Sequence, residues 1–181
     1  MLIEQTGMEG LLLVTPEAIA DERGFFMEAF RQDVLEKSGV NAVFVQDNLV
    51  RSEAAGIVRG LHFQRPPAAQ AKFIGVLRGA IFDVAVDLRK GKPSFGQWKS
   101  FILSAENNRR LFIPRGFAHG YMTLEAQTEV MYKTDAYYAP KHDAGIFWKD
   151  PLLKINWPDL PPVLSNKDAN LQRLSDFISP F

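Results

Sequence analysis

The pattern of apolar and polar residues along this chain predicts one short helix and many short strands. Residues 81–88 alternate between the two faces of a strand. Val84 and Val86 share one face, and Asp83 and Asp87 share the other. The predicted helix covers residues 33–38 and ends at Gly39, a residue that commonly terminates helices.

The remaining segments read as strands separated by turns. The predicted strands cover residues 44–50, 57–63, 72–77, 97–103, 111–113, 120–124 and 128–134. Turn-forming residues such as Arg78-Gly79 and Pro114-Arg115-Gly116 lie between them. Many short strands at close spacing favour a sandwich or barrel, and a jelly-roll barrel leaves a cavity at its centre. We therefore predict an all-β jelly roll with short helical or irregular segments at its N- and C-terminal ends.

Polar residues interrupt some strand faces. Gln46 and Asn48 share one face of residues 44–50, and His62 lies in residues 57–63. A polar side chain inside a barrel is costly unless it meets a partner or a ligand. Gln46 and Asn48 therefore either line the predicted cavity or face solvent, and the pattern alone leaves both readings open.

Composition narrows the functional class. The 181 residues suit a single domain over 1–181, and the 14 Phe, 13 Gly and 11 Pro are typical of packed sheets joined by turns. The 21 basic and 21 acidic residues balance, so we expect no nucleic-acid partner. The chain has no cysteine, no secretory pattern in residues 1–10 and no apolar run that would span a membrane. We expect a cytoplasmic protein without a membrane partner.

Two of the three histidines lie in segments that could carry chemistry. The spacing Pro114-x-Gly116-x-x-His119 resembles the second motif of the cupin superfamily, in which the histidine binds a metal. The segment around His62 has no second histidine, and no acidic residue occurs from 60 to 81. Two imidazoles are too few for a transition-metal site, so we expect neither metal nor cofactor. His142 is expected at the surface.

Several dispersed motifs follow one another in a specific order. They are Asp21-x-Arg23-Gly24-x-Phe26-x-Glu28-x-Phe30, Gln46-x-Asn48, Arg59-Gly60-Leu61-His62-x-Gln64, Asp83-Val84-Ala85-Val86-Asp87-x-Arg89, Pro114-x-Gly116-Phe117-Ala118-His119-Gly120 and Tyr132-x5-Tyr138-x-Pro140. Further matches follow at Ile146-x-Trp148-x-Asp150-Pro151, Ile155-x-Trp157-Pro158 and Ser165-x-Lys167-Asp168. Together these motifs, spread over roughly residues 1–170, resemble the dTDP-4-dehydrorhamnose 3,5-epimerase family, which has a cupin-type jelly-roll fold.

The resemblance implies a reaction and assigns roles to four residues. The family epimerises C3 and C5 of a nucleotide-linked 4-keto-6-deoxyhexose, because a proton can leave either carbon next to the ketone. His62 matches the general base, and Asp168 matches the carboxylate that orients it. Tyr132 matches the acid on the opposite face of the sugar. Lys72 matches the cation near the enolate oxygen.

The resemblance also implies a binding site for the nucleotide sugar. The matching residues are Arg23, Phe26, Glu28, Gln46, Asn48, Arg59, His119, Tyr138 and Lys167. Arg59 is expected to bind the diphosphate, with Arg23 and Lys167 in support. Phe26 and Tyr138 match residues that pack on the base, and His119 is expected to supply a donor or to shape the pocket. The segment with Arg23, Phe26 and Glu28 comes from a neighbouring subunit in the family, which implies a homodimer.

One geometric problem remains in this assignment. In a straight strand, Arg59 and His62 point to opposite faces. Gly60 permits a bulge that re-aims one of them, and otherwise Arg59 faces outward.

Three other functions fit parts of the pattern. An epimerase that inverts only C3 or only C5, or a related isomerase, would share the motifs. A non-catalytic sugar-binding cupin would be favoured if His62, Tyr132 or Asp168 were missing, and all three are present. A metal-dependent cupin is disfavoured by the incomplete ligand set.

Overall fold

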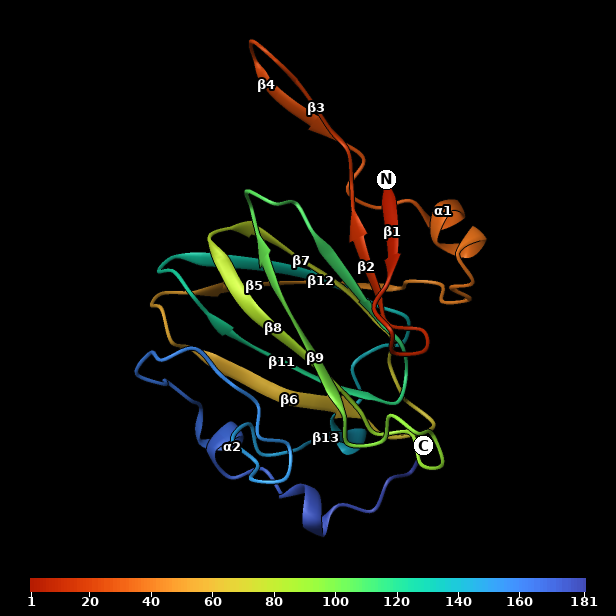
Figure 1. Cartoon of the computed structure of the whole chain (residues 1–181), viewed down its shortest axis with the longest axis vertical. Coiled ribbons are helices and arrows are strands. Elements are labelled where there is room, and N and C mark those ends of the chain that lie inside the picture. Colours follow the sequence, from red (N-terminus) through yellow and green to blue (C-terminus); the bar gives the residue numbers. More distant parts are fainter.

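The computed structural model describes residues 1–181 and consists mainly of two antiparallel sheets (Figure 1). The six-stranded sheet has the order β1-β2-β10-β7-β12-β5. Its strands are β1 (Leu2–Gln5), β2 (Leu12–Thr15), β10 (Arg110–Ile113), β7 (Lys72–Arg78), β12 (Thr128–Thr134) and β5 (Gln46–Ser52). The five-stranded sheet has the order β13-β6-β11-β8-β9. Its strands are β13 (Asp143–Gly145), β6 (Val58–Gln64), β11 (Phe117–Thr123), β8 (Ala80–Asp87) and β9 (Trp98–Ser104).

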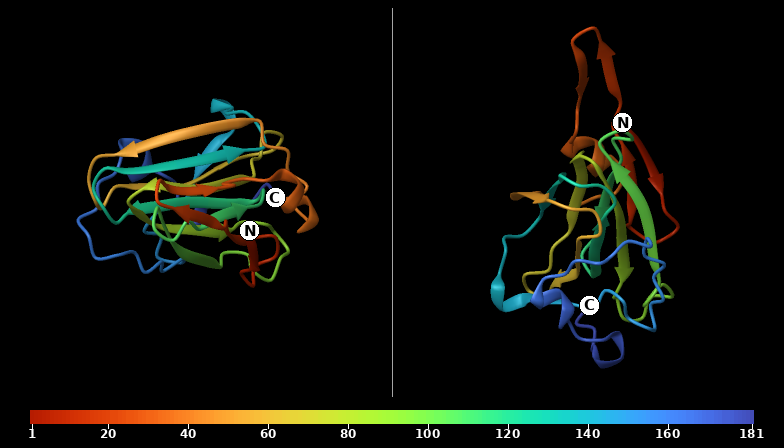
Figure 2. Two further views of the ribbon diagram at one scale, coloured as in Figure 1. Left: turned by 90° about the horizontal axis from the view of Figure 1, so that it is seen from above. Right: turned by 90° about the vertical axis from the view of Figure 1, so that its left-hand side faces the viewer.

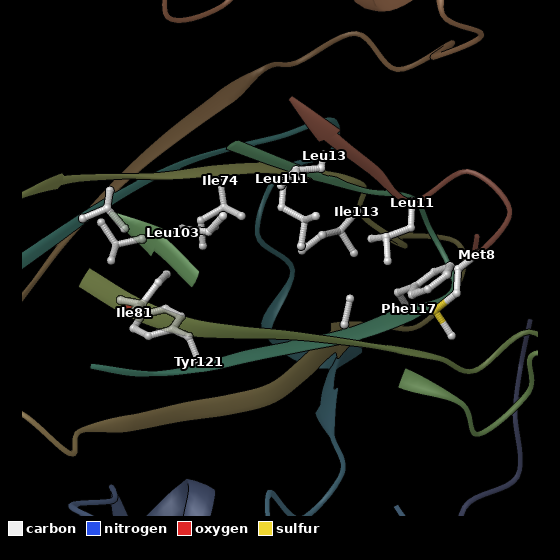
Figure 3. Close-up of a cluster of buried hydrophobic side chains, with 13 residues drawn as sticks. Met8, Leu11, Leu13, Ile74, Ile81, Leu103, Leu111, Ile113, Phe117 and Tyr121 are labelled. Carbon is white, nitrogen blue, oxygen red and sulfur yellow. The ribbon is translucent and has the colours of Figure 1, made fainter. Parts of the chain in front are cut away.

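The two sheets face each other and bury a common core, as the view from above shows (Figure 2). Inward-facing residues of both sheets form one cluster, with Leu111 and Ile74 from one sheet and Ile81 and Phe117 from the other (Figure 3). Consecutive strands such as β6 and β7 belong to different sheets, so the chain passes repeatedly between the two layers. The predicted all-β, jelly-roll architecture is confirmed.

The five-stranded sheet is covered on its outer face as well. The C-terminal segment supplies Ile146, Leu153 and Phe177, which pack against Val84 and Val86 of β8. Strand β8 is therefore buried on both faces, and even Asp83 and Asp87 have no exposed surface. The alternation in residues 81–88 correctly predicted a strand, whose Asp83 and Asp87 face turns toward the other sheet while Val84 and Val86 face the C-terminal segment.

The helices are few and short. Helix α1 (Gln32–Lys37) begins one residue before its predicted start. Gly39 follows it with a φ of 87°, a left-handed conformation that glycine adopts without steric cost. Near the C-terminus are helix α2 (Asn166–Ala169) and the short 3-10 helices η1 (Pro140–His142) and η2 (Leu174–Asp176). No helix in the structure combines the length and the apolar surface that crossing a bilayer requires.

The N-terminal region differs from the helical or irregular segment that we predicted. It contains β1, β2 and the hairpin of β3 (Ala18–Asp21) and β4 (Gly24–Met27). Residues 11–14 are all apolar, and all four are buried, so an alternating pattern is absent there. The β3–β4 hairpin projects away from the two sheets (Figures 1 and 2). Its side chains Ile19, Phe25 and Phe26 are 64%, 63% and 67% exposed.

Candidate active site

A cavity of about 230 Å³ lies between the two sheets. It is lined by Val50, Arg59, His62, Lys72, His119, Tyr121, Tyr132 and Asp168. A second hollow of about 170 Å³ shares His62, Lys72 and Tyr132 with it. This hollow adds Tyr138, Asp143 and Lys167 at the surface. The two hollows form one candidate site, and strands β6, β7, β11 and β12 supply most of its wall.

His62 and Asp168 form a close pair, as the resemblance implied. His62 Nε2 lies 2.5 Å from Asp168 Oδ1. Ser165 caps helix α2, because its Oγ accepts a hydrogen bond from the Asp168 backbone N–H at 3.1 Å, and this holds the carboxylate in place. Burial opposes ionisation of Asp168, but the hydrogen bonds from His62 and Ser165 outweigh it and bring its pKa below the ordinary carboxyl value. The contact assigns the His62 proton to Nε2, so Nδ1 is the nitrogen that can accept a proton.

Lys72 is a buried cation beneath this pair. Its Nζ donates to the His62 backbone carbonyl at 3.3 Å. Burial lowers the pKa of Lys72 to about 8, although the charges of Asp83 and Asp143 act in the opposite direction. Near neutral pH the ammonium is still mostly protonated, so the site contains a positive charge held in an environment of low polarity.

His119 is paired with Asp83, a carboxylate for which the sequence predicted no role. Its Nε2 lies 2.9 Å from Asp83 Oδ2, and both residues are buried. Burial lowers the pKa of His119 against the opposing effect of Asp83, so the imidazole is neutral near pH 7. A neutral ring that donates through Nε2 has only an acceptor left at Nδ1. In this arrangement His119 shapes the cavity and can accept a hydrogen bond from a ligand through Nδ1.

Tyr132 lies on the opposite sheet from His62. It is on β12, half-buried, and burial raises its pKa, so its hydroxyl stays protonated through the neutral range. Asn48 lies directly opposite it on β5, and the Asn48 Oδ1 accepts a hydrogen bond from Gln46 Nε2 at 2.8 Å. Gln46 Oε1 in turn accepts from the Tyr138 backbone N–H at 3.0 Å. Gln46 and Asn48 are thus half-buried on the Tyr132 side of the sheet and bonded within the protein, although neither is among the residues that line the two hollows.

Arg59 and His62 line the same cavity despite their spacing. The register between β6 and β11 shifts here, because His119 pairs with His62 whereas Tyr121 pairs with Arg59. Gly60 has a φ of 123°, and a Cβ at this position would lie 2.5 Å from the Cα of Gly120. The irregularity predicted at Gly60 is present, and Arg59 faces the pocket.

Tyr138 and Lys167 meet at the rim through Asp143, another carboxylate for which the sequence predicted no role. The Tyr138 hydroxyl donates to Asp143 Oδ2 at 3.0 Å, and Lys167 Nζ donates to the same oxygen at 2.5 Å. The Tyr138 ring is 56% exposed, so its face is open to a ligand. His142 precedes Asp143 in η1 and is half-buried, with its backbone carbonyl accepting from Arg65.

Three predicted binding residues do not reach this site within one chain. Arg23 and Phe26 are on the projecting hairpin, and Glu28 follows it. All three are exposed, and the charged ends are paired only locally, Arg23 with Asp21 and Glu28 with Arg31. No group of three or more histidine, aspartate or glutamate side chains lies close enough together to hold a metal ion.

The fold and cavity define a class of protein. It is a jelly roll whose inter-sheet cavity contains a histidine–aspartate pair, a facing tyrosine and a buried lysine, an arrangement suited to proton transfer on a bound ligand. Residues 5–176 match the family model described as dTDP-4-dehydrorhamnose 3,5-epimerase. The chain belongs to this family.

Individual relatives agree with the family match. The dTDP-4-dehydrorhamnose 3,5-epimerase of Shigella flexneri is 46% identical over 177 residues, which is 97% of each chain. The crystal structure of the Bacillus anthracis enzyme, with TDP and PPi bound, is 50% identical, with a TM-score of 0.93 over 96% of this chain and 99% of that one. The Legionella pneumophila enzyme, solved in complex with dTDP-4-keto-L-rhamnose, is 44% identical, with a TM-score of 0.94 over 98% and 94% of the two chains.

Proposed function

We propose that this protein is an isomerase that inverts C3 and C5 of dTDP-4-dehydro-6-deoxyglucose to give dTDP-4-dehydrorhamnose. The observation that carries this proposal is the placement of His62, with Asp168 behind it, and Tyr132 on opposite walls of one cavity. Inversion at carbon needs a base on one face of the sugar and an acid on the other. The membership of the chain in the epimerase family and the ligands in its relatives' structures support the same activity.

The ketone at C4 makes the protons on C3 and C5 acidic. His62 removes one of these protons, and the electron pair of the C–H bond moves into an enolate whose charge lies on the C4 oxygen. Tyr132 then donates its hydroxyl proton to the carbon from the opposite face, which restores the ketone with inverted configuration. Solvent removes the proton from His62 and returns one to Tyr132, so the enzyme is unchanged after each inversion.

Lys72 supplies the charge that stabilises the enolate. It is the buried ammonium of the cavity, and burial makes a fixed charge more effective than the same charge in water. Its pKa of about 8 means that the ammonium is present at neutral pH without a carboxylate bound directly to it. A ligand oxygen that gains negative charge is therefore a better partner for Lys72 than the His62 carbonyl to which it now donates.

The remaining predicted residues bind the nucleotide. Arg59 inside the cavity and Lys167 at the rim attract the diphosphate, since a protein of zero formal net charge must bind it with local cations. The exposed ring of Tyr138 packs on the base, and Gln46, Asn48 and His119 add polar contacts to the ligand.

A homodimer completes the site in this proposal. Arg23, Phe26 and Glu28 do not reach the cavity of their own chain, and the hairpin that carries the first two exposes large apolar side chains. A complementary apolar surface exists on the outer face of the six-stranded sheet, where Leu49 and Leu77 are 67% and 47% exposed. Burying both surfaces between two copies would remove them from water and bring each hairpin to the other subunit. A cytoplasmic location stays a prediction from the sequence.

The proposal is tested by supplying dTDP-4-keto-6-deoxyglucose in D₂O and locating the deuterium by NMR. Inversion at both carbons places deuterium at C3 and C5 of the product. Label at only one carbon would identify a C3-only or C5-only epimerase, and no label would indicate a protein that only binds the sugar. The same assay after exhaustive chelation should give the same rate, because the proposed steps use side chains alone.

A further inference from the structure

Tyr121 carries a hydroxyl group that the steps above do not use. The residue lies on β11, two positions after His119, so both side chains point to the interior of the sandwich. Tyr121 is 4% exposed and lines the cavity, and it lies at the end of the core cluster opposite Met8 and Phe117 (Figure 3). Its hydroxyl oxygen is buried and has no hydrogen-bond partner in the protein.

The surroundings of Tyr121 fix the ring but leave the hydroxyl group unpaired. The ring packs in the core with Ile81, Ala85 and Val130. The Oγ of the buried Ser52 accepts a hydrogen bond from Arg59 Nε at 3.4 Å and forms none with Tyr121. Burial raises the pKa of Tyr121 far above its ordinary value, so the group acts only as a neutral donor or acceptor. A buried hydroxyl without a partner is unfavourable, and a ligand oxygen would satisfy it.

The proposed roles of two neighbours indicate which part of a bound nucleotide sugar would face this hydroxyl. Arg59 is the cross-strand partner of Tyr121, and it is the proposed diphosphate ligand. Tyr132, the proposed acid for C3 and C5, lines the same cavity from the other sheet. In a nucleotide hexose, the diphosphate is attached at C1, so the C2 hydroxyl and the ring oxygen lie between it and the carbons on which Tyr132 acts, and the hydroxyl is the better hydrogen-bond partner.

We propose that the Tyr121 hydroxyl donates a hydrogen bond to the C2 hydroxyl of the bound hexose and makes the site selective for 2-hydroxy over 2-deoxy sugars. This inference rests on the proposed function. A site built to hydrogen-bond a hydroxyl rejects the analogue that lacks it, because its own polar group is then left buried and unpaired.

The test is a comparison of Tyr121→Phe with the wild type on two substrates, dTDP-4-keto-6-deoxyglucose and its 2-deoxy counterpart. Wild-type kcat/KM should be about 10- to 100-fold lower for the 2-deoxy substrate. Tyr121→Phe should lose a similar factor on the 2-hydroxy substrate, mainly through KM, and should no longer distinguish the two. Tyr137→Phe, at a tyrosine that is 70% exposed, is the matched control and should behave as the wild type.

Thermal unfolding separates this role from a structural one. Removing an unpaired buried hydroxyl should leave the melting temperature unchanged or raise it, whereas loss of a structural hydrogen bond to Ser52 would lower it. A lowered melting temperature with unchanged sugar discrimination would overturn the inference, and so would an equal loss on both substrates. Failure of the proposed function would be seen separately, as no turnover of the 2-hydroxy substrate by the wild type, and it would remove the inference with it.

Discussion

Tyr132 and Asn48 lie directly opposite each other on the antiparallel strands β12 and β5. The Asn48 Nδ2 is buried and has no partner in the protein, although its Oδ1 is bonded to Gln46. An amide donor is therefore available next to the proposed acid, on the wall that faces His62. Because the two strands fix this pair, the acid is placed by backbone pairing and not by a mobile loop.

Replacing Tyr132 with Phe should separate proton exchange from inversion. His62 can still remove a proton and return a solvent proton to the same face, so deuterium wash-in should persist. Delivery to the opposite face is lost, so product formation should fall by about 10²- to 10⁴-fold. Both quantities can be followed in one D₂O experiment by NMR. His62→Ala should abolish both, and wild-type inversion by Tyr132→Phe would contradict the assignment.

Replacing Asp168 with Asn should impair the base without removing it. The carboxylate holds the proton of His62 on Nε2, and an amide can present either a donor or an acceptor to that nitrogen. We expect kcat to fall by about 10²- to 10⁴-fold while KM changes little, because the substrate contacts remain. Asp159→Asn, at an exposed aspartate, is the control. An Asp168→Asn variant with wild-type kcat would show that His62 needs no orienting carboxylate.

The sequence predicted the strands of this site, but it did not by itself predict the contacts between residues that are far apart along the chain. The strands were predictable because short-range alternation follows from the two faces of a sheet. His62 and Asp168 are 106 residues apart, so only the family resemblance brought them together in advance. The pocket-facing Arg59 depends on the irregular backbone at Gly60, which the sequence permits but does not require.

Asp83, Asp143 and Tyr121 were missed for a different reason. Alternation places Tyr121 on the same face as His119, and that signal was present in the sequence. A tyrosine in a strand is ordinary, however, and nothing in the sequence shows that its hydroxyl lacks a partner. Asp83 lies on the face of β8 that turns toward the other sheet, and its partner His119 is 36 residues away, so the sequence does not show that the two side chains meet.

The depressed pKa of Lys72 predicts an alkaline limit to activity. Lys72 loses its charge as the pH rises through about 8, whereas burial keeps Tyr132 protonated beyond its ordinary range. The kcat/KM profile, which reports groups of the free enzyme, should therefore decline above about pH 8. Lys72→Met should lower kcat by about 10²- to 10³-fold and remove this decline.

Stability provides the control for that variant. A lysine whose pKa is lower in the folded state than in the unfolded chain destabilises the fold below pH 8, and this penalty disappears as the pH rises to the unfolded value. The melting temperature of Lys72→Met at pH 7 should therefore not fall. A variant that keeps the wild-type alkaline decline would show that another group is responsible.

The exposed hairpin predicts a dimer with shared active sites. Sedimentation at micromolar concentration should give twice the chain mass of 20.4 kDa.

Arg23 and Glu28 would serve the partner's cavity, so the double variant Arg23→Ala/Glu28→Ala should have a raised KM. The variant His62→Ala should be inactive. Mixing these two variants after partial unfolding and refolding should restore activity at low substrate concentration. In each mixed dimer, the subunit with an intact His62 receives the intact hairpin of the other subunit. If each site used the hairpin of its own chain, no subunit in the mixture would combine both, and activity would not recover. A fully active monomer would exclude the shared site altogether, whereas recovery that depends on mixing would assign the hairpin to the neighbouring subunit.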